Sequence, residues 1–385
     1  CGGEVRLRLA VSGAGIPSAV RLVYMEDGKG EVRKDMPYIF DVGDHCIYSV
    51  NVKMPEKAGL VWYYFELETE RGMVYYGNNS KQLGGIGEMC FNSPSNSYQI
   101  TVYNEDYKTP DWFKTGIAYQ IFVDRFCNGN ENGEFLGNRT DIIKRNWGEQ
   151  PFYKAEQFGG EYKANDFFGG NLKGVIKKLP YLKDLGISVI YLNPIFKAYS
   201  NHKYDTGDYE TIDPMFGDEE TFKELCSKAK EMGIRIILDG VFNHTGSNSR
   251  YFNKYGEYDS VGAYQSKESP YYTWFRFMDW PDVYESWWGM TTLPQIEEHS
   301  EECRKYLLSD KDAIVKRWIK NGASGWRLDV VDELPGFFVK ELRENVKKAD
   351  KDAVIIGEVW EDASNKSAYG ERREYFLGKE LDSVM

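Results

Sequence analysis

The stretch Gly325-Trp326-Arg327-Leu328-Asp329-Val330-Val331 has the composition of a buried β-strand that carries an arginine and an aspartate two residues apart. Side chains alternate between the two faces of a strand, so Arg327 and Asp329 share one face. Buried charges are tolerated in folded proteins only when they are paired. We therefore expect a polar site at one end of this strand.

A second apolar stretch follows, Asp352-Ala353-Val354-Ile355-Ile356-Gly357-Glu358-Val359-Trp360, and it carries a carboxylate, Glu358, near its end. Two parallel strands that each end in an acid supply the minimum for general acid/base chemistry on an uncharged substrate. A structural ion pair is the alternative for Arg327 with Asp329. The further polar residues at matching strand ends, described below, favour catalysis.

Composition and charge narrow the class of protein. A chain of 385 residues with 42% hydrophobic residues is expected to form two or three globular domains. The net charge of −12 argues against a nucleic-acid partner, which would favour a basic face. No apolar run approaches the roughly 20 residues of a membrane span. The 15% aromatic content fits either large cores or platforms for stacking on sugars.

The positions of the six cysteines indicate whether the protein lies in a reducing or an oxidising compartment. None of the six lies in a C-x-x-C pair, so a zinc site is not expected. Their scatter along the chain favours free thiols in a reducing compartment, and hence a cytoplasmic location. The chain starts at Cys1 rather than Met, so removal of an N-terminal segment, with a secreted or surface-anchored protein, stays an alternative.

Residues 1–105 alternate apolar and polar side chains over short runs separated by turn residues, and no helical period is evident. This pattern predicts an antiparallel β-sandwich. The strands are expected at 5–9, 19–25, 46–54, 60–68, 73–76 and 98–102. A polar stretch with a proline, residues 104–110, is expected to be a linker.

Residues 111–385 alternate strand and helix patterns. Strands are expected at 117–123, 187–192, 234–238, 326–331, 354–359 and 382–385. Helices are expected after the caps Asn171 and Asp218, at 304–320 and at 337–348, with a kink at Pro180. Asp332 and Glu333 are expected to start the last of these helices. Repeated βα units predict a parallel sheet, either doubly wound or closed into a (β/α)₈ barrel.

Polar residues at the carboxyl ends of the predicted strands favour the barrel, because these ends converge on one site there. They are Asn193, Asp239, Asp329 and Glu358. A metal pair formed by Asp239 and His244 lacks a third ligand at suitable spacing. The roughly sixty residues between the third strand and the next helix are too long for a plain connection. They are rich in aromatic residues, so we expect an inserted subdomain at 245–300 that walls the cleft.

Several motifs resemble the sequence blocks of the α-amylase superfamily, glycoside hydrolase family 13. Three of them are Asp239-Gly240-Val241-Phe242-Asn243-His244, Gly325-Trp326-Arg327-Leu328-Asp329 and Gly357-Glu358-Val359-Trp360. Residues 119–126 resemble the first barrel strand of that family, and residues 201–206 the loop after its second strand. The N-terminal sandwich together with these loops is similar to the neopullulanase, cyclomaltodextrinase and amylopullulanase branch.

The resemblance implies a retaining glycosidase that cleaves α-1,4 and perhaps α-1,6 bonds of maltodextrin, cyclodextrin, pullulan or starch. Asp329 would be the nucleophile that forms a covalent glycosyl intermediate, and Glu358 the general acid/base. Arg327 is expected to keep Asp329 ionised, because a close positive charge lowers the pKa of a carboxylate. The residues predicted to bind substrate are Tyr204, His202, Asp239, His244, Asn193 and Trp288.

The sequence departs from the family in one respect. The third essential aspartate, in an Asn-His-Asp block after the seventh barrel strand, is absent, as are strands seven and eight. The barrel is therefore expected to be incomplete, and the chain is not expected to be fully active alone. A glucan-binding or partner-binding relative that has lost catalysis stays an alternative, as does a glucosyl transferase or isomerase of the same superfamily.

The resemblance also implies a structural Ca²⁺ site between the first strand and the first helix. Its oxygen ligands would be Asn128, Asn130, Gly169 and Asn171. No organic cofactor is expected. Relatives with this N-terminal domain often pair through it, so a homodimer through residues 1–105 is expected by analogy.

Overall fold

The computed structural model describes residues 1–12, 16–94 and 96–385. The chain forms two compact units. The first contains Cys1–Lys108 with two later segments, Ser364–Lys366 and Arg372–Lys379. The second contains Thr109–Ala363, Ser367–Glu371 and Glu380–Met385. The sequence prediction did not anticipate that the two short segments belong to the first unit.

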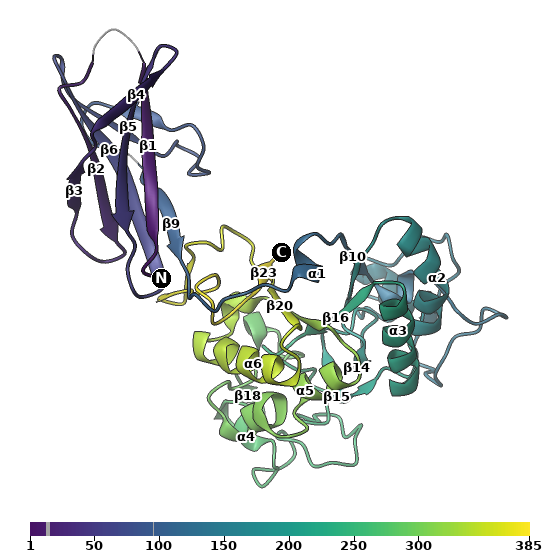
Figure 1. Ribbon diagram of the computed structural model, residues 1–385. Coiled ribbons are helices and arrows are strands. Elements are labelled where there is room, and N and C mark those ends of the chain that lie inside the picture. Colours follow the sequence, from purple (N-terminus) through teal and green to yellow (C-terminus); the bar gives the residue numbers. More distant parts are fainter. Residues whose placement is uncertain (13–15, 95) are drawn as a thin grey trace. The chain divides into compact units, whose positions relative to one another are not determined.

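The first unit is a β-sandwich of two antiparallel sheets (Figure 1). One sheet has the order β1-β5-β4, with β1 (Glu4–Ser12), β4 (Tyr38–Val42) and β5 (His45–Lys53). The other has the order β3-β2-β6-β7-β8, and β9 also pairs with β6. Its strands are β2 (Ala19–Glu26), β3 (Val32–Asp35), β6 (Gly59–Thr69), β7 (Gly72–Gly77), β8 (Glu88–Cys90) and β9 (Tyr98–Val102). The predicted all-β sandwich is confirmed.

The strands β3 and β4 were not predicted, and their burial explains why. Every side chain of both strands is exposed, so neither shows the apolar alternation of a half-buried strand. The core lies between the sheets and is built by alternate residues of the longer strands, such as Leu22, Val52 and Phe65. Edge strands of this kind are defined by their pairing and not by their own pattern.

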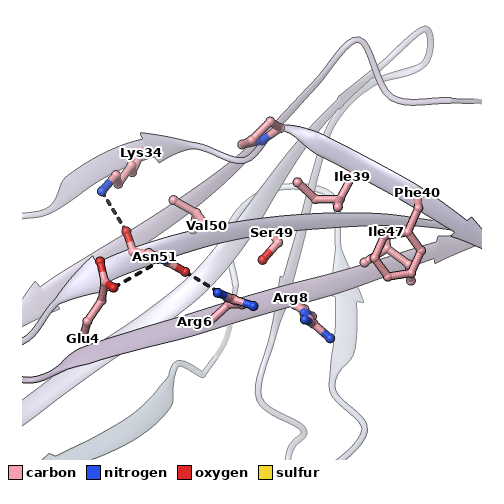
Figure 2. A pocket seen from close by; sticks show the side chains of 11 residues that line it. Glu4, Arg6, Arg8, Lys34, Ile39, Phe40, Ile47, Ser49, Val50 and Asn51 are labelled. Atoms are coloured by element: carbon pink, nitrogen blue, oxygen red, sulfur yellow. Dashed lines mark hydrogen bonds between the residues drawn. The ribbon is translucent and has the colours of Figure 1, made fainter.

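A groove of about 580 Å³ lies on the first unit, lined by residues of β1, β4 and β5 together with Lys34 and Pro37 (Figure 2). Asn51 is one of its lining residues. The Asn51 side chain accepts a hydrogen bond from Arg6 Nε (3.2 Å) and donates one to Glu4 Oε2 (3.4 Å). The Asn51 carbonyl accepts one from Lys34 Nζ (2.8 Å). Several charged side chains of this groove are therefore held by one asparagine.

The second unit is built on a six-stranded parallel sheet with the order β10-β13-β16-β19-β20-β23. The strands are β10 (Ala118–Ile121), β13 (Val189–Leu192), β16 (Arg235–Gly240), β19 (Gly325–Leu328), β20 (Val354–Gly357) and β23 (Ser383–Val384). Each strand pairs with the next one along the chain, and helices separate most of them (Figure 1). This is the predicted incomplete (β/α) barrel.

The described helices of this unit are α1 (Asp111–Lys114), α2 (Leu172–Asp184), α3 (Glu219–Glu231), α4 (Glu301–Arg304), α5 (Ile314–Lys320) and α6 (Gly336–Ala349). Of these, α2 and α3 begin at the predicted caps and carry buried apolar stripes. Asn171 Oδ1 accepts from Gly174 N (2.9 Å), and Asp218 Oδ1 accepts from Thr221 N (2.8 Å), so both are N-caps. The helix α2 continues through Pro180. No helix in the described ranges is both long and apolar enough to cross a membrane.

The predicted helix at 304–320 is wrong in its middle. The helix α4 passes into a π-helical turn, η5 (Lys305–Ser309), and α5 starts only at Ile314. Ser309, Asp310 and Asp312 favour turns over helix, because their side chains compete for backbone hydrogen bonds. Similarly, α6 starts at Gly336, and residues 332–333 lie in the short 3₁₀ turn η6 (Val331–Glu333) instead.

Residues 245–300, between β16 and α4, hold little regular structure. The elements are η3 (Tyr272–Trp274), β17 (Phe277–Asp279), β18 (Val283–Tyr284) and η4 (Trp287–Gly289). A buried aromatic cluster that includes Tyr251, Phe252 and Trp274 holds the segment together. Three further strand pairs are β11 (Ile143–Lys144) with β12 (Asp166–Phe167), β14 (Phe196–Ala198) with β15 (Thr206–Ile212), and β21 (Ser367–Ala368) with β22 (Glu371–Arg372). Two short 3₁₀ turns are η1 (Val123–Arg125) and η2 (Ala155–Phe158).

A buried acid in this segment predicts an unusual pH dependence of stability. Burial raises the pKa of Glu298 from 4.5 to about 8. The unfolded chain therefore loses this proton at a lower pH than the folded chain, and stability falls as the pH rises from 4.5 to 8. Replacing Glu298 by Gln should stabilise the protein at pH 8 by on the order of 3 kcal/mol, and by much less at pH 5. Thermal melts at the two pH values measure this.

The exposed Glu302 provides the matched control, since Glu302→Gln should shift the melting temperature equally little at both pH values. An equal shift for Glu298→Gln at pH 5 and pH 8 would contradict the assignment of a buried, neutral acid at this position.

Candidate active site

One guanidinium group joins three carboxylates at the ends of neighbouring strands. Arg327 lies on β19 and pairs in register with Asp239 on β16. Arg327 Nη1 donates to Asp239 Oδ1 (2.8 Å) and Oδ2 (3.1 Å) and to Asp329 Oδ1 (3.0 Å). Arg327 Nη2 lies 2.7 Å from Oε2 of Glu358, which directly follows β20. The two acids predicted to act on one sugar therefore face the same side chain.

The charge state of this cluster differs from the prediction. Burial first, and then the negative charge of Asp239, raise the pKa of Asp329 from 3.8 to about 8, although Arg327 lowers it. Burial also raises the pKa of Asp239, which accepts a hydrogen bond from the Tyr191 hydroxyl. Arg327 therefore does not act on Asp329 alone, because two buried acids and the partly exposed Glu358 share one cation.

The turn after Asp329 fixes the second acid. Val330 has φ = +37°, a left-handed conformation that is costly for a β-branched residue. In this conformation the Val330 N–H donates to Glu358 Oε2 (3.0 Å). Asn243 Nδ2 donates to the carbonyl of Asp329 (2.7 Å) and so anchors the same turn. The backbone between the two strands is thus held in place by contacts with Glu358 and Asn243.

Polar side chains from β13 and from the loop after β14 meet at the same edge. Asn193 Nδ2 donates to the hydroxyl of Tyr204 (3.3 Å), which also lies 3.4 Å from the hydroxyl of Tyr191. Asn193 Oδ1 accepts from Gln120 Nε2 on β10 (2.9 Å). Because Tyr191 hydrogen-bonds to Asp239, this group is continuous with the carboxylate cluster.

His202 is held as a neutral ring in the same loop. Its Nδ1 accepts a hydrogen bond from Tyr204 N (3.2 Å) and lies 3.1 Å from Ser200 Oγ. Burial lowers the pKa of His202. A neutral ring that accepts at Nδ1 carries its proton on Nε2, so Nε2 is a hydrogen-bond donor.

Lys203, between these two residues, was not predicted to matter and is fully buried. It has φ = +65°, which turns His202 and Tyr204 to the same side of the loop. Lys203 Nζ lies 2.7 Å from Asp213 Oδ2 and donates to the carbonyl of Ala198 (3.1 Å). This buried ion pair anchors the loop at the β14–β15 hairpin.

Replacing Lys203 by Met is expected to leave Asp213 buried without its counter-charge, which costs about 3–5 kcal/mol. The loop should shift, and if the protein acts on the maltodextrin that the family resemblance implies, kcat/KM should fall by about 100-fold, mostly through KM. The double variant Lys203→Met with Asp213→Asn should recover most of the stability. Lys223→Met, which removes an ion pair on the outside of α3, is the control and should change neither quantity. Unchanged kinetics in Lys203→Met would contradict a role in positioning.

The family follows from a direct comparison. Residues 120–379 match the family described as alpha amylase, catalytic domain. The chain belongs to the α-amylase family. The amylopullulanase of Thermoanaerobacterium saccharolyticum is 39% identical over 100% of this chain and 31% of its own length. The cyclomaltodextrinase of Thermoanaerobacter pseudethanolicus is 40% identical over 72% of this chain and 43% of its own length.

Among solved structures, the type III pullulan hydrolase from Thermococcus kodakarensis has a TM-score of 0.63 at 30% identity. That alignment covers 99% of this chain and 61% of the hydrolase. The chain therefore spans less than half the length of the two curated relatives and about three fifths of this solved structure.

In this member of the α-amylase family, His244 lies in the buried wall beside the carboxylates. It is 2% exposed, and neither ring nitrogen has a hydrogen-bond partner among the described residues. Its ring lies 4.9 Å from the ring of Trp287. Burial lowers the pKa of His244 to about 4, so the ring is neutral at pH 7. A buried imidazole with both nitrogens unpaired is an unsatisfied site for a hydroxyl group.

Three tryptophans lie beside Glu358. Trp287 and Trp288 stack with ring centroids 4.8 Å apart, and Trp288 meets Trp360 edge to face at 5.7 Å. Trp360 Nε1 donates to Glu358 Oε1 (3.3 Å). The indoles of Trp287 and Trp288 both donate to Glu333, so this residue fixes the aromatic pair. The rings of Trp288 and Trp360 are 61% and 59% exposed, and each offers a face to a ligand.

The residues predicted to hold Ca²⁺ in this family member lie in the loops between β10 and α2. They are Asn128, Asn130, Gly169 and Asn171. Asn171 Oδ1 already accepts from Gly174 N (2.9 Å) and Gly129 N (3.1 Å). Asn128 Oδ1 accepts from Asn130 N (2.8 Å) and Asn171 Nδ2 (3.2 Å). No cluster of three or more His, Cys, Asp or Glu suited to a metal occurs among the described residues. In this arrangement the side-chain oxygens of Asn128 and Asn171, two of the four predicted ligands, are already engaged by protein donors.

Sequence reasoning missed Tyr191, Asn243, Glu333 and Trp360 as members of the site. Tyr191 could have been found, because it lies two residues before Asn193 and so shares its face of the strand. Trp360 likewise follows Glu358 by two residues. Glu333 gave no such signal, because its partners are more than forty residues away in the chain.

Proposed function

We propose that this chain carries the catalytic site of a retaining glycosidase acting on α-1,4 and α-1,6 bonds of maltodextrin, cyclodextrin, pullulan or starch. The observation that supports this most is the common contact of Asp329 and Glu358 with the guanidinium of Arg327. Two carboxyl groups that contact the same guanidinium fit a covalent route, in which they act on one sugar from either side. Membership of the α-amylase family agrees with it.

In the proposed reaction, an ionised oxygen of Asp329 attacks the anomeric carbon while Glu358 gives its proton to the leaving glycosidic oxygen. The bond to the leaving sugar breaks, and a glycosyl-aspartate forms. Glu358, now a carboxylate, then takes a proton from water, and the hydroxide attacks the same carbon and releases Asp329. Two inversions retain the configuration. Arg327 stabilises the charge of the released carboxylate throughout.

The surroundings divide into two sides of the scissile bond. The Trp360 indole donates to Glu358, the proposed proton donor, so Trp360 and the adjacent Trp288 would stack on the sugar that leaves. Tyr204, His202, Asn193 and His244 would bind the sugar that becomes attached to Asp329. Support comes from the donor at His202 Nε2 and from the unpaired nitrogens of His244. Asp239 would act through Arg327 and Tyr191.

Proton NMR of the first product released from maltohexaose, cyclodextrin and pullulan tests this proposal in the full-length natural protein. We expect the α-anomer to appear before mutarotation, and cleavage of at least one of the three substrates. A β-anomer as first product, or no cleavage of any α-glucan, would refute it. Longer products than the starting glucan would instead favour a transferase, for which the exposed Trp288 and Trp360 offer an acceptor platform.

A calcium ion has no part in the proposed chemistry. Because the oxygens of Asn128 and Asn171 are engaged by backbone and side-chain donors, we expect EDTA to lower the melting temperature by no more than about 1 °C. A rise of several degrees on adding millimolar Ca²⁺ would show instead that the loop rearranges to bind the ion, as the family resemblance implies.

We infer a reducing, cytoplasmic compartment from the six cysteines, which are free thiols. A homodimer through the first unit also stays a proposal. Thiol titration under native and denaturing conditions and analytical ultracentrifugation test the two inferences separately. Titration of six thiols supports the reducing compartment. A species of twice the monomer mass supports the homodimer if it is lost when residues 1–108 are exchanged for another domain.

A further inference from the structure

A cavity of about 540 Å³ lies in the second unit, behind the loop that carries His202 and Tyr204. This Tyr199–Tyr258 pocket is walled by the β14–β15 hairpin, by residues 137–141 and by residues 248–258 of the inserted segment. Its volume lies within the range of small-molecule sites in proteins. None of the residues assigned above to the catalytic chemistry lines it.

The lining combines flat aromatic rings with polar groups of both signs. The phenol rings of Tyr199 and Tyr258 contribute apolar surface, and Met215 adds to it. Two cations, Arg139 and Lys197, and three acids, Asp141, Asp213 and Glu257, surround them. Because the charges nearly balance, the pocket favours a neutral polar ligand over an anion or a cation.

Some of these groups lack a protein partner. Lys197 Nζ lies 4.3 Å above the ring of Tyr258, and neither this amine nor the Tyr258 hydroxyl makes a hydrogen bond or ion pair with the described residues. Glu257 Oε2 accepts only from Asn248 Nδ2 (3.3 Å). By contrast, Arg139 is engaged by Asp141 and by the carbonyl of Tyr199. An amine, a hydroxyl and a carboxylate therefore remain available to a ligand.

We propose that the Tyr199–Tyr258 pocket is a second binding site for a short α-glucan segment, separate from the catalytic cluster. A glucose ring presents an apolar face that stacks on a phenol and a rim of neutral hydroxyls that both donate and accept. The amine of Lys197, the hydroxyl of Tyr258 and the second oxygen of Glu257 match that rim. The choice of an α-glucan among neutral sugars rests on the proposed function.

The pocket is also connected to the catalytic loop. Asp213 lines it and pairs with the buried Lys203, which precedes Tyr204. Tyr199 directly precedes Ser200, whose hydroxyl lies 3.1 Å from His202 Nδ1. A glucan bound here would therefore touch the two anchors of the loop that binds substrate. Occupancy is expected to favour long glucans, which reach both sites, over short ones.

Calorimetric titration of the full-length protein with maltotetraose, in the Glu358→Gln background to prevent turnover, tests this inference. We expect two binding events per chain. Tyr258→Ala and, separately, Lys197→Ala should each weaken one event by at least about tenfold and leave the other unchanged. Lys267→Ala is the matched control, because Lys267 also lies over an aromatic ring, that of Trp280, outside the pocket.

In the background with Glu358 intact, Lys197→Ala should leave kcat for maltotriose unchanged and raise KM for amylopectin several-fold. A single binding event that neither variant alters, with maltodextrin still cleaved, would overturn the second site while the proposed function stands. Two events, one of them sensitive to Lys197→Ala, in a protein that cleaves no α-glucan would keep the site and overturn the proposed function. If Tyr258→Ala does not fold, Lys197→Ala decides, since the Lys197 amine makes no hydrogen bond or ion pair with the described residues.

Discussion

Replacing Glu358 by Gln is expected to lower kcat on maltodextrin by about 10³–10⁴-fold in the full-length protein, with the fold intact. Glutamine keeps the size of the side chain and one acceptor oxygen, whereas Glu358 accepts at both oxygens, and it has no proton to give to the leaving oxygen. Glu358 is partly exposed and does not carry the core, so the melting temperature should change little. Glu341→Gln, on the outside of α6, is the control and should leave kcat unchanged.

A substrate with a dinitrophenyl leaving group separates the two proposed roles of Glu358. That group leaves without a proton, so the variant should release about one equivalent of dinitrophenolate in a burst and then stall at the glycosyl-aspartate. A variant that turns over maltodextrin at the normal rate would exclude Glu358 as the acid. Loss of the burst together with loss of folding would point to a structural role instead.

Replacing Arg327 by Met should destabilise the protein by about 3–5 kcal/mol at pH 7, together with loss of activity. Arg327 is the cation that hydrogen-bonds to Asp239 and Asp329 and pairs with Glu358. Burial already raises the pKa of Asp329 to about 8 against the pull of Arg327. Without Arg327 the pKa of both aspartates rises further.

The pH dependence follows from the sign of these shifts. An acid whose pKa is raised on folding destabilises the folded state as the pH rises, because the unfolded chain gives up its proton first. The loss of stability in the Arg327→Met variant should therefore be smallest near pH 4 and largest above pH 8. Thermal melts at several pH values measure this loss. Arg343→Met removes a buried partner of Asp382 away from this cluster. It should destabilise the protein without a loss of kcat. Equal kinetic loss in both variants would contradict the special role of Arg327.

The sequence predicts the parts of the site that follow a strand period. Alternation places Arg327 and Asp329 on one face, and the convergence of strand ends in a barrel brings Glu358 to the same site. The parts of the site that the sequence does not predict depend on contacts between residues distant in the chain. The hydrogen bonds of Trp287 and Trp288 to Glu333 and the burial of Lys203 against Asp213 leave no local pattern.

The raised pKa of Asp329 was not predicted, for a related reason. The prediction considered one neighbouring cation, whereas the buried site places Asp239 and Glu358 around the same arginine. Three acids share Arg327 because three neighbouring strands bring them together. Two sequence motifs considered separately do not show how many acids will share the arginine. The break at 309–313 was missed because apolar spacing continues across it while the backbone leaves the helix.

The division of the chain has a practical consequence for anyone who exchanges modules between related enzymes. The β-sandwich owns two pieces of sequence, Ser364–Lys366 and Arg372–Lys379, that follow the proposed acid by fewer than twenty-five residues. A single cut near residue 108 would separate both segments from the β-sandwich and leave them on the other fragment. A domain exchange that keeps the fold must therefore transfer three segments, Cys1–Lys108, Ser364–Lys366 and Arg372–Lys379.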